Sequence, residues 1–239
     1  MTYLAFTHIS HRILVEKELD RTRNDAQVTG ILLAGSVARG DTSPSSDLDL
    51  CFLLHDGCAR VFEAETISGI LVERKYADAV QARIKIERNP MEVYAYLDGC
   101  ILMDRQGILA TLTVAARDRF ETYKMPNEER QSIAAWLRSA AIKIKAARST
   151  GDDLKAAFVA TTIAWKILEG MWAVNNRPMP PSGCVIPHLK DLHLQPIVAD
   201  PDWFRGLFQA NAQVRIETAL ALINGLVPLL SAPTEMAKR

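Results

Sequence analysis

Residues 28–50 read VTGILLAGSVARGDTSPSSDLDL, and this stretch decides the fold of the chain around it. The run of apolar and small residues at 28–34 predicts a short buried strand that ends abruptly at Gly35-Ser36. A Gly- and Ser-rich connection follows, and residues 47–54 predict a second strand. Because side chains alternate along a strand, Asp47 and Asp49 should emerge on one face while the intervening leucines pack on the other.

The break after the first strand has the chemistry of a phosphate site. Gly35 lets the backbone approach a ligand closely, and Ser36 offers a hydroxyl and an amide where a helical turn begins. Helix starts present unpaired N–H groups and a positive dipole end, which favour an anion. Arg39, one turn further, would add charge for the same phosphates.

The two aspartates predict a divalent cation. Asp47 and Asp49 would repel each other unless a cation lay between them. Magnesium is the expected ion, because it prefers hard oxygen ligands and accepts a couple of carboxylates together with substrate phosphates. A phosphate cradle facing a carboxylate pair is the apparatus for in-line phosphoryl or nucleotidyl transfer.

A third acid should come from a neighbouring strand. Two strand-like runs at 60–66 and 70–76 flank Ile67-Ser68-Gly69 and predict a hairpin. Glu73 lies within the second run, flanked by apolar residues, where an acid needs an explanation. It would coordinate the metal or act as a base; alternatively, it is an outward strand residue paired with Arg74 or Lys75.

The pattern Gly-Ser-x-x-x-Gly, followed by Ser-Asp-x-Asp, resembles the signature of the DNA polymerase β-like nucleotidyltransferases. Within that superfamily the chain resembles the small bacterial enzymes that adenylylate antibiotics, such as the kanamycin and lincosamide nucleotidyltransferases. The resemblance implies a mixed sheet with the active site on one face, two magnesium ions, and a nucleoside triphosphate donor, expected to be ATP. The catalytic and metal-binding acids that it implies are Asp47, Asp49 and Glu73. The residues expected to bind the triphosphate are Gly35, Ser36, Arg39 and Ser46.

The sequence departs from the kanamycin-type enzymes at one point. Those enzymes place a catalytic glutamate on the first helix of their C-terminal half, but residues 134–145 of this chain contain no acid. Our hypothesis is that Glu73 is the base that deprotonates the acceptor hydroxyl instead.

The fold class expected for the whole chain is α+β. Residues 1–122 should form the catalytic domain, a mixed β-sheet flanked by helices, and residues 123–239 a C-terminal α-helical bundle. Helical periodicity predicts a first helix over 7–24 and a last one over 210–230. Between them, helices are expected from 126 to 149 and, capped by Gly151-Asp152-Asp153, on to 174.

The bulk composition limits the partners. Of the 239 residues, 49% are hydrophobic, and 28 basic residues balance 28 acidic ones. A protein that tracks duplex nucleic acid needs a basic excess, so the neutral balance favours a small hydroxylated acceptor over a nucleic acid. The four scattered cysteines form no zinc-ligand pattern, and no stretch reads as a signal peptide or membrane span. We therefore expect a cytoplasmic protein, and a homodimer by resemblance.

Two other functions compete with small-molecule transfer. The same site could AMPylate a partner protein, as in an antitoxin, although small antitoxins usually lack so long a helical extension. A nucleotide-binding regulator without catalysis is the second alternative, and the intact acids argue against it.

Overall fold

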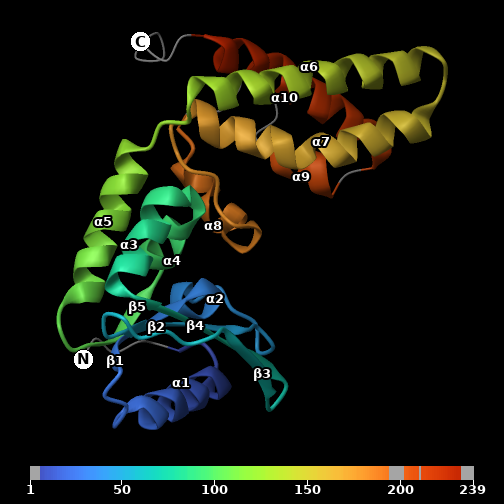
Figure 1. The fold of residues 1–239 in the computed structure, drawn as a ribbon. Helices are drawn as coiled ribbons and strands as arrows, with labels where there is room; N and C mark the ends of the chain where they lie inside the picture. Colours follow the sequence, from blue (N-terminus) through green and yellow to red (C-terminus); the bar gives the residue numbers. More distant parts are fainter. Residues whose placement is uncertain (1–5, 194–201, 210, 233–239) are drawn as a thin grey trace. The chain divides into compact units, whose positions relative to one another are not determined.

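The computed structural model describes residues 6–193, 202–209 and 211–232. It divides into two compact units, which Figure 1 shows in the colours of the sequence. The first unit comprises Met1–Thr122 together with Pro180–Pro187, and the second comprises Tyr123–Met179 with His188–Arg239. The short segment Pro180–Pro187 therefore packs with the first unit, although the chain on both sides of it belongs to the second.

The first unit is built on a five-stranded mixed sheet with the strand order β3-β4-β2-β1-β5. Strands β2 and β4 are parallel, and the remaining neighbours are antiparallel. The strands are β1 (Val28–Ala34), β2 (Leu48–Leu54), β3 (Glu63–Ile67), β4 (Ile70–Asp78) and β5 (Cys100–Asp104). The expected mixed sheet flanked by helices is thus confirmed, but β2 starts one residue late, so Asp47 precedes the strand.

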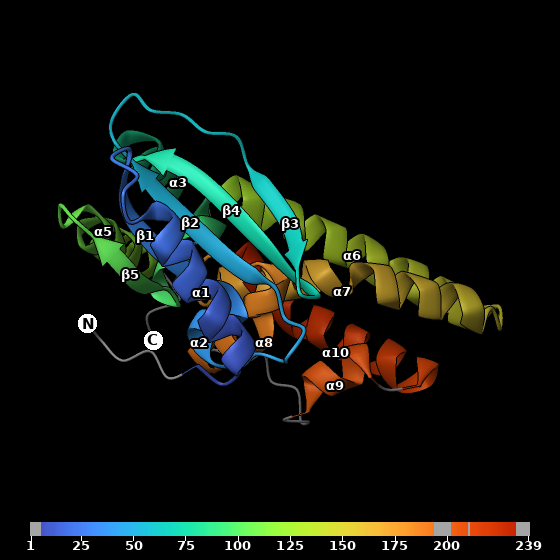
Figure 2. The same cartoon turned by 90° about the horizontal axis from the view of Figure 1, so that it is seen from below.

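Helices cover both faces of this sheet (Figures 1 and 2). Helix α1 (Ile9–Thr22) packs on one face, where Leu14 and Val15 meet alternate residues of the central strands. The other face carries the helices that follow β4 in the chain, whose apolar residues meet Leu32 and Leu53. These helices are α3 (Ala79–Arg88), the 3-10 turn η1 (Pro90–Glu92), α4 (Val93–Leu97) and α5 (Ile108–Thr122).

The β3–β4 hairpin forms as its sequence predicts. Ser68 and Gly69 both have positive φ, at 51° and 82°, which is the backbone conformation of a tight two-residue hairpin turn. Strand β4 pairs with β3 through this hairpin on one side and lies parallel to β2 on its other side.

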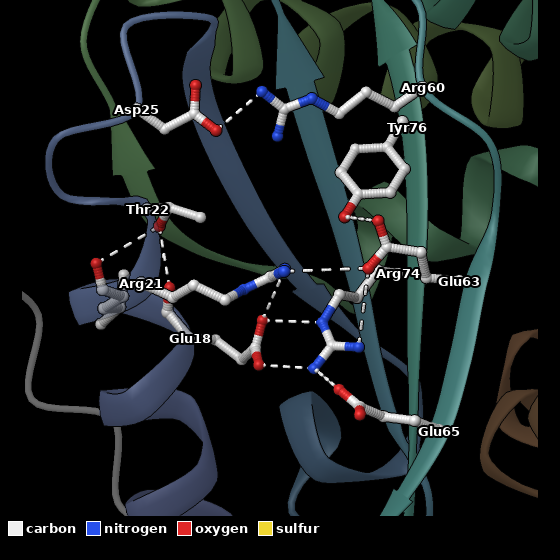
Figure 3. Close-up of polar contacts among 10 residues, drawn as sticks. Glu18, Arg21, Thr22, Asp25, Arg60, Glu63, Glu65, Arg74 and Tyr76 are labelled. Atoms are coloured by element: carbon white, nitrogen blue, oxygen red, sulfur yellow. Dashed lines mark hydrogen bonds and ion pairs between the residues drawn. The ribbon is translucent and has the colours of Figure 1, made fainter.

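A buried ion pair decides which way the side chains of β4 point (Figure 3). The Arg74 guanidinium donates to both carboxylate oxygens of Glu18 on α1, at 2.8 and 2.6 Å. Burial is the largest influence on the pKa of Glu18 and raises it, but the Arg74 hydrogen bond and the nearby guanidinium charges outweigh burial and lower it. Because side chains alternate, Arg74 facing α1 directs Glu73 and Lys75 to the opposite face.

The second unit is helical. Its long helices α6 (Asn127–Ser149), α7 (Asp153–Val174) and α10 (Ala212–Ser231) pack on one another, with the short α9 (Trp203–Phe208) beside α10. Asp152 caps α7 by accepting a hydrogen bond from the Lys155 amide, as the Gly-Asp-Asp punctuation predicts. The shorter pieces η2 (Ser182–Cys184), α8 (Val185–His188) and η3 (Leu189–Asp191) lie between α7 and α9 in the chain.

The expectation that no stretch reads as a membrane span is corrected by helices α7 and α10, which are long and apolar enough to cross a bilayer by length and composition alone. In the structure 56% of the apolar window of α7 and 33% of that of α10 are buried inside the protein. Core helices of soluble proteins pass the same test, so these two helices are weak evidence for a membrane span.

Candidate active site

The turn from β1 into α2 (Gly35–Arg39) strongly favours a glycine at its first position. Gly35 has a φ of +71°, a region that L-residues with a Cβ rarely adopt. A Cβ at Gly35 would also lie 2.4 Å from Oδ2 of Asp49, far inside contact distance. The backbone at the start of α2 therefore lies directly against the Asp49 carboxylate, and Gly35 and Asp49 form one site.

The loop that leads to Asp47 is fastened to the first helix of the chain. His11 is fully buried and its Nε2 lies 2.9 Å from the carbonyl oxygen of Ser46, which can only accept, so Nε2 carries the proton. The Nε2 of His8 lies 3.2 Å from the Thr42 carbonyl oxygen in the same way. The Ser46 hydroxyl accepts from the amide of Ser43 at 2.9 Å. Ser46 thus shapes the loop, while its role toward a triphosphate stays a prediction.

The register of the sheet brings two of the predicted acids together. Asp49 and Glu73 are direct partners in the parallel pairing of β2 with β4, so their side chains lie next to each other on the same face. Asp47 is exposed at the end of the loop, and the described part of the chain gives its carboxylate no hydrogen bond or ion pair. Leu48 and Leu50 are fully buried on the opposite face, as predicted.

Lys75 bridges the two neighbouring acids. Its Nζ lies 2.9 Å from Oδ1 of Asp49 and 3.3 Å from Oε2 of Glu73. Partial burial lowers the pKa of Lys75, but the hydrogen bond and charge of Asp49 outweigh burial and raise it, so Lys75 is an ammonium ion. Of the two pairings that the sequence allowed for Glu73, the structure makes the one with Lys75, because Arg74 faces α1.

Arg39 is engaged in structural contacts. Its guanidinium donates to Asp41 and to Asp98, each at 3.2 Å, and to the Gly183 carbonyl oxygen at 3.1 Å. One Nη also lies 3.1 Å from the sulfur of Cys184, and the Arg39 side chain is only 11% exposed. Arg39 therefore ties the end of α2 to the segment Pro180–Pro187, and its predicted contact with phosphate would require these bonds to open.

These elements enclose a cleft of about 560 Å³ within the first unit. Gly35, Ser36, Asp47, Asp49 and Lys75 line one side of it. The other lining residues are Ala34, Arg39, Cys51 and residues from the segments 89–95 and 181–184. Glu92 is among these lining residues. Glu73 is not, but it lies beside the lining residue Asp49 in the sheet.

The acids provide suitable oxygen ligands for magnesium. Carboxylate oxygens are the donors that magnesium prefers, and a cation already lies between Asp49 and Glu73 in the form of the Lys75 ammonium. Within the described ranges, no group of three or more His, Cys, Asp or Glu side chains is gathered closely enough to hold a metal. A three-acid ligand set therefore requires Asp47, Asp49 and Glu73 to come closer together, and the Lys75 ammonium to leave Asp49.

Sequence reasoning missed several residues that build this site. Lys75 was expected only as a possible partner of Glu73, and its contact with Asp49 was missed, although Lys75 lies two residues after Glu73 and so on the same strand face. Glu92, Gly183 and Cys184 carry no comparable signal, because they reach the cleft only through the packing of distant segments. His11 was likewise invisible, since its partner is a backbone carbonyl group.

Part of the chain matches a known protein family. Residues 15–102 match the family model described as "Nucleotidyltransferase domain". Among solved structures, a nucleotidyltransferase-like protein from Exiguobacterium sibiricum is similar, with 15% sequence identity and a TM-score of 0.44 over 90% of this chain and 73% of that one. No curated protein matches the sequence.

Proposed function

We propose that the nucleotidyltransferase domain at residues 15–102 transfers a nucleoside monophosphate from a nucleoside triphosphate, expected to be ATP, to a hydroxyl group of a small acceptor. The observation that carries the proposal is the contact of the Gly35 backbone with the Asp49 carboxylate, with Glu73 beside Asp49 in the sheet. This contact sets amide groups suited to phosphate directly beside carboxylates suited to magnesium.

Each residue then has a defined task. Ser36 and the amides at the start of α2 bind the triphosphate, and Asp47 and Asp49, with Glu73, hold magnesium. When bound, magnesium neutralises charge on the triphosphate and on the departing pyrophosphate. The acceptor oxygen bonds to the α-phosphorus as the bond from that phosphorus to the pyrophosphate oxygen breaks. Glu73 takes the proton of the acceptor hydroxyl.

The role of Glu73 as the base is tested by comparing the turnover of Glu73→Gln with that of Glu92→Gln. Glu92 is an acid in the wall of the cleft. We expect Glu73→Gln to lose turnover by a factor of about 10² to 10⁴, the usual contribution of a general base, while it still binds magnesium through Asp47 and Asp49. Glu92→Gln should lose much less. If Glu73→Gln keeps full turnover and Glu92→Gln does not, the base is Glu92.

The acceptor class we propose first is an aminoglycoside- or lincosamide-like antibiotic, which rests on the motif resemblance of residues 35–50. A homodimer belongs to the same proposal, and light scattering tests it. Protein AMPylation and nucleotide-dependent regulation without transfer remain the competing functions, and the experiment below separates them.

The test is a pyrophosphate-release screen with magnesium and each of the four nucleoside triphosphates. Its acceptors are aminoglycosides, lincosamides and small hydroxylated metabolites, and the control is the Asp47→Asn/Asp49→Asn double variant. Acceptor-dependent release that vanishes in the control supports the proposal and identifies the acceptor class. Binding of triphosphate without release from any small acceptor points to a protein acceptor or a regulator. If no triphosphate binds, the proposal is wrong.

A further inference from the structure

Lys75 has an unusual position for a site that is proposed to hold magnesium. Its ammonium bonds to Asp49 at 2.9 Å and to Glu73 at 3.3 Å, which are the carboxylates proposed to bind the metal. A metal ion bound to these carboxylates would lie close to the Lys75 ammonium, and the two cations would repel each other. Lys75 and the metal are therefore competitors for Asp49.

Lys75 is free to move when it loses that competition. Its side chain is 48% exposed in the wall of the cleft, and four rotatable methylene groups connect the ammonium to the strand. The strand itself is fixed on the other face by the Arg74–Glu18 pair. Displacing the ammonium therefore requires only side-chain rotation.

Among the described residues that line the cleft, Arg39 is the one other cationic side chain, and its guanidinium already has hydrogen-bond partners. Arg39 is bound to two carboxylates and a backbone carbonyl and is largely buried. A triphosphate that enters the cleft with magnesium brings several negative charges beside Lys75. Phosphate oxygens can accept hydrogen bonds from an ammonium that has lost Asp49.

We propose that Lys75 is the mobile cation of this site: it neutralises Asp49 and Glu73 in the empty cleft and moves to the triphosphate when a divalent ion replaces it there. The inference rests on the proposed function, since it needs a triphosphate in the cleft. It also explains how two neighbouring carboxylates coexist before the metal arrives.

The proposal predicts opposite effects of one substitution on two ligands. In Lys75→Met, manganese alone should bind about fivefold more tightly, because a competing half-exposed ion pair of about 1 kcal/mol is gone. An ATP analogue with a methylene group between the α- and β-phosphorus should bind roughly tenfold more weakly in saturating manganese, since a charge-assisted contact is lost. A purely structural role would not move the two affinities in opposite directions.

The experiment measures free manganese by electron paramagnetic resonance and analogue binding by calorimetry, in wild type, Lys75→Met, Lys75→Gln and Lys75→Arg. The matched control is Lys17→Met, an exposed lysine of α1 on the opposite side of the sheet. Lys75→Gln should show the same two changes as Lys75→Met, so the test still stands if one of the two variants folds poorly. Lys75→Arg should retain most of the analogue affinity.

Either of two results overturns the inference. One is unchanged or weaker manganese binding in Lys75→Met and Lys75→Gln, and the other is unchanged analogue binding in both. In those cases wild type still binds both ligands, so the proposed function survives. If wild type binds neither manganese nor the analogue, the proposed function fails and the inference fails with it.

Discussion

Replacing Gly35 by alanine tests the contact on which the proposed site depends. The new Cβ would lie 2.4 Å from Oδ2 of Asp49, whereas ordinary contact begins at 3.4 Å, so the carboxylate has to retreat by about 1 Å. The left-handed backbone at Gly35 adds a folding cost of about 1–2 kcal/mol for any residue with a Cβ. The substitution therefore combines a small loss of stability with a displaced ligand.

The chain supplies a matched control in Gly57. Its φ is +77°, close to that of Gly35, but a Cβ built there meets no atom within 4 Å. Gly57→Ala should therefore share the backbone cost of about 1–2 kcal/mol and leave Asp49 undisturbed. The difference between the two variants isolates the effect of moving the Asp49 carboxylate.

The expected result is a large functional gap between two proteins that share the same backbone cost. A 1 Å displacement in a catalytic constellation costs about 10²-fold in rate. Pyrophosphate release by Gly35→Ala should fall by this order relative to Gly57→Ala, and manganese should bind more weakly. Urea unfolding measures the stabilities, and electron paramagnetic resonance measures the manganese. If Gly35→Ala binds manganese and turns over as Gly57→Ala does, the assignment of Asp49 as a ligand is refuted.

Three further predictions concern the framework of the site. Folding lowers the pKa of Glu18, so the Glu18 carboxylate stabilises the fold at pH values above its ordinary pKa of 4.5. This stabilisation is lost as the pH falls through the pKa of Glu18 in the folded state. Urea unfolding should therefore show wild type weakening below pH 4.5, with Glu18→Gln less stable by about 3 kcal/mol at pH 7 and less sensitive to acid. Burial raises the pKa of Cys51 and Cys184 to about 11, so at pH 8 iodoacetamide should alkylate both about a hundredfold more slowly than a thiol with the ordinary value of 9.0; equal rates in mass-spectrometric mapping would contradict this. Arg39→Met should cost about 2 kcal/mol and speed limited proteolysis near Cys184, and unchanged cleavage there would show that Arg39 does not hold the segment.

The local features of the fold were predictable because their signals are local. The buried strand before Gly35, the hairpin at Ser68-Gly69 and the Asp152 cap each follow from the preferences of a few adjacent residues. The mixed sheet followed from the motif resemblance of residues 35–50 and is confirmed. The start of β2 was one residue out, since hydrophobic alternation does not specify where ladder hydrogen bonds begin.

What the sequence alone determined is the set of chemical groups: a glycine break, two aspartates two residues apart, and an acid on a nearby strand. The tertiary structure alone decided which charges meet. Strand register paired Glu73 with Asp49 and brought Lys75 between them. Cys184, which follows Arg39 by 145 residues in the chain, contacts the Arg39 guanidinium. The reason is physical: alternation fixes the direction of a side chain within its own strand, whereas a charge contact depends on how separate elements align.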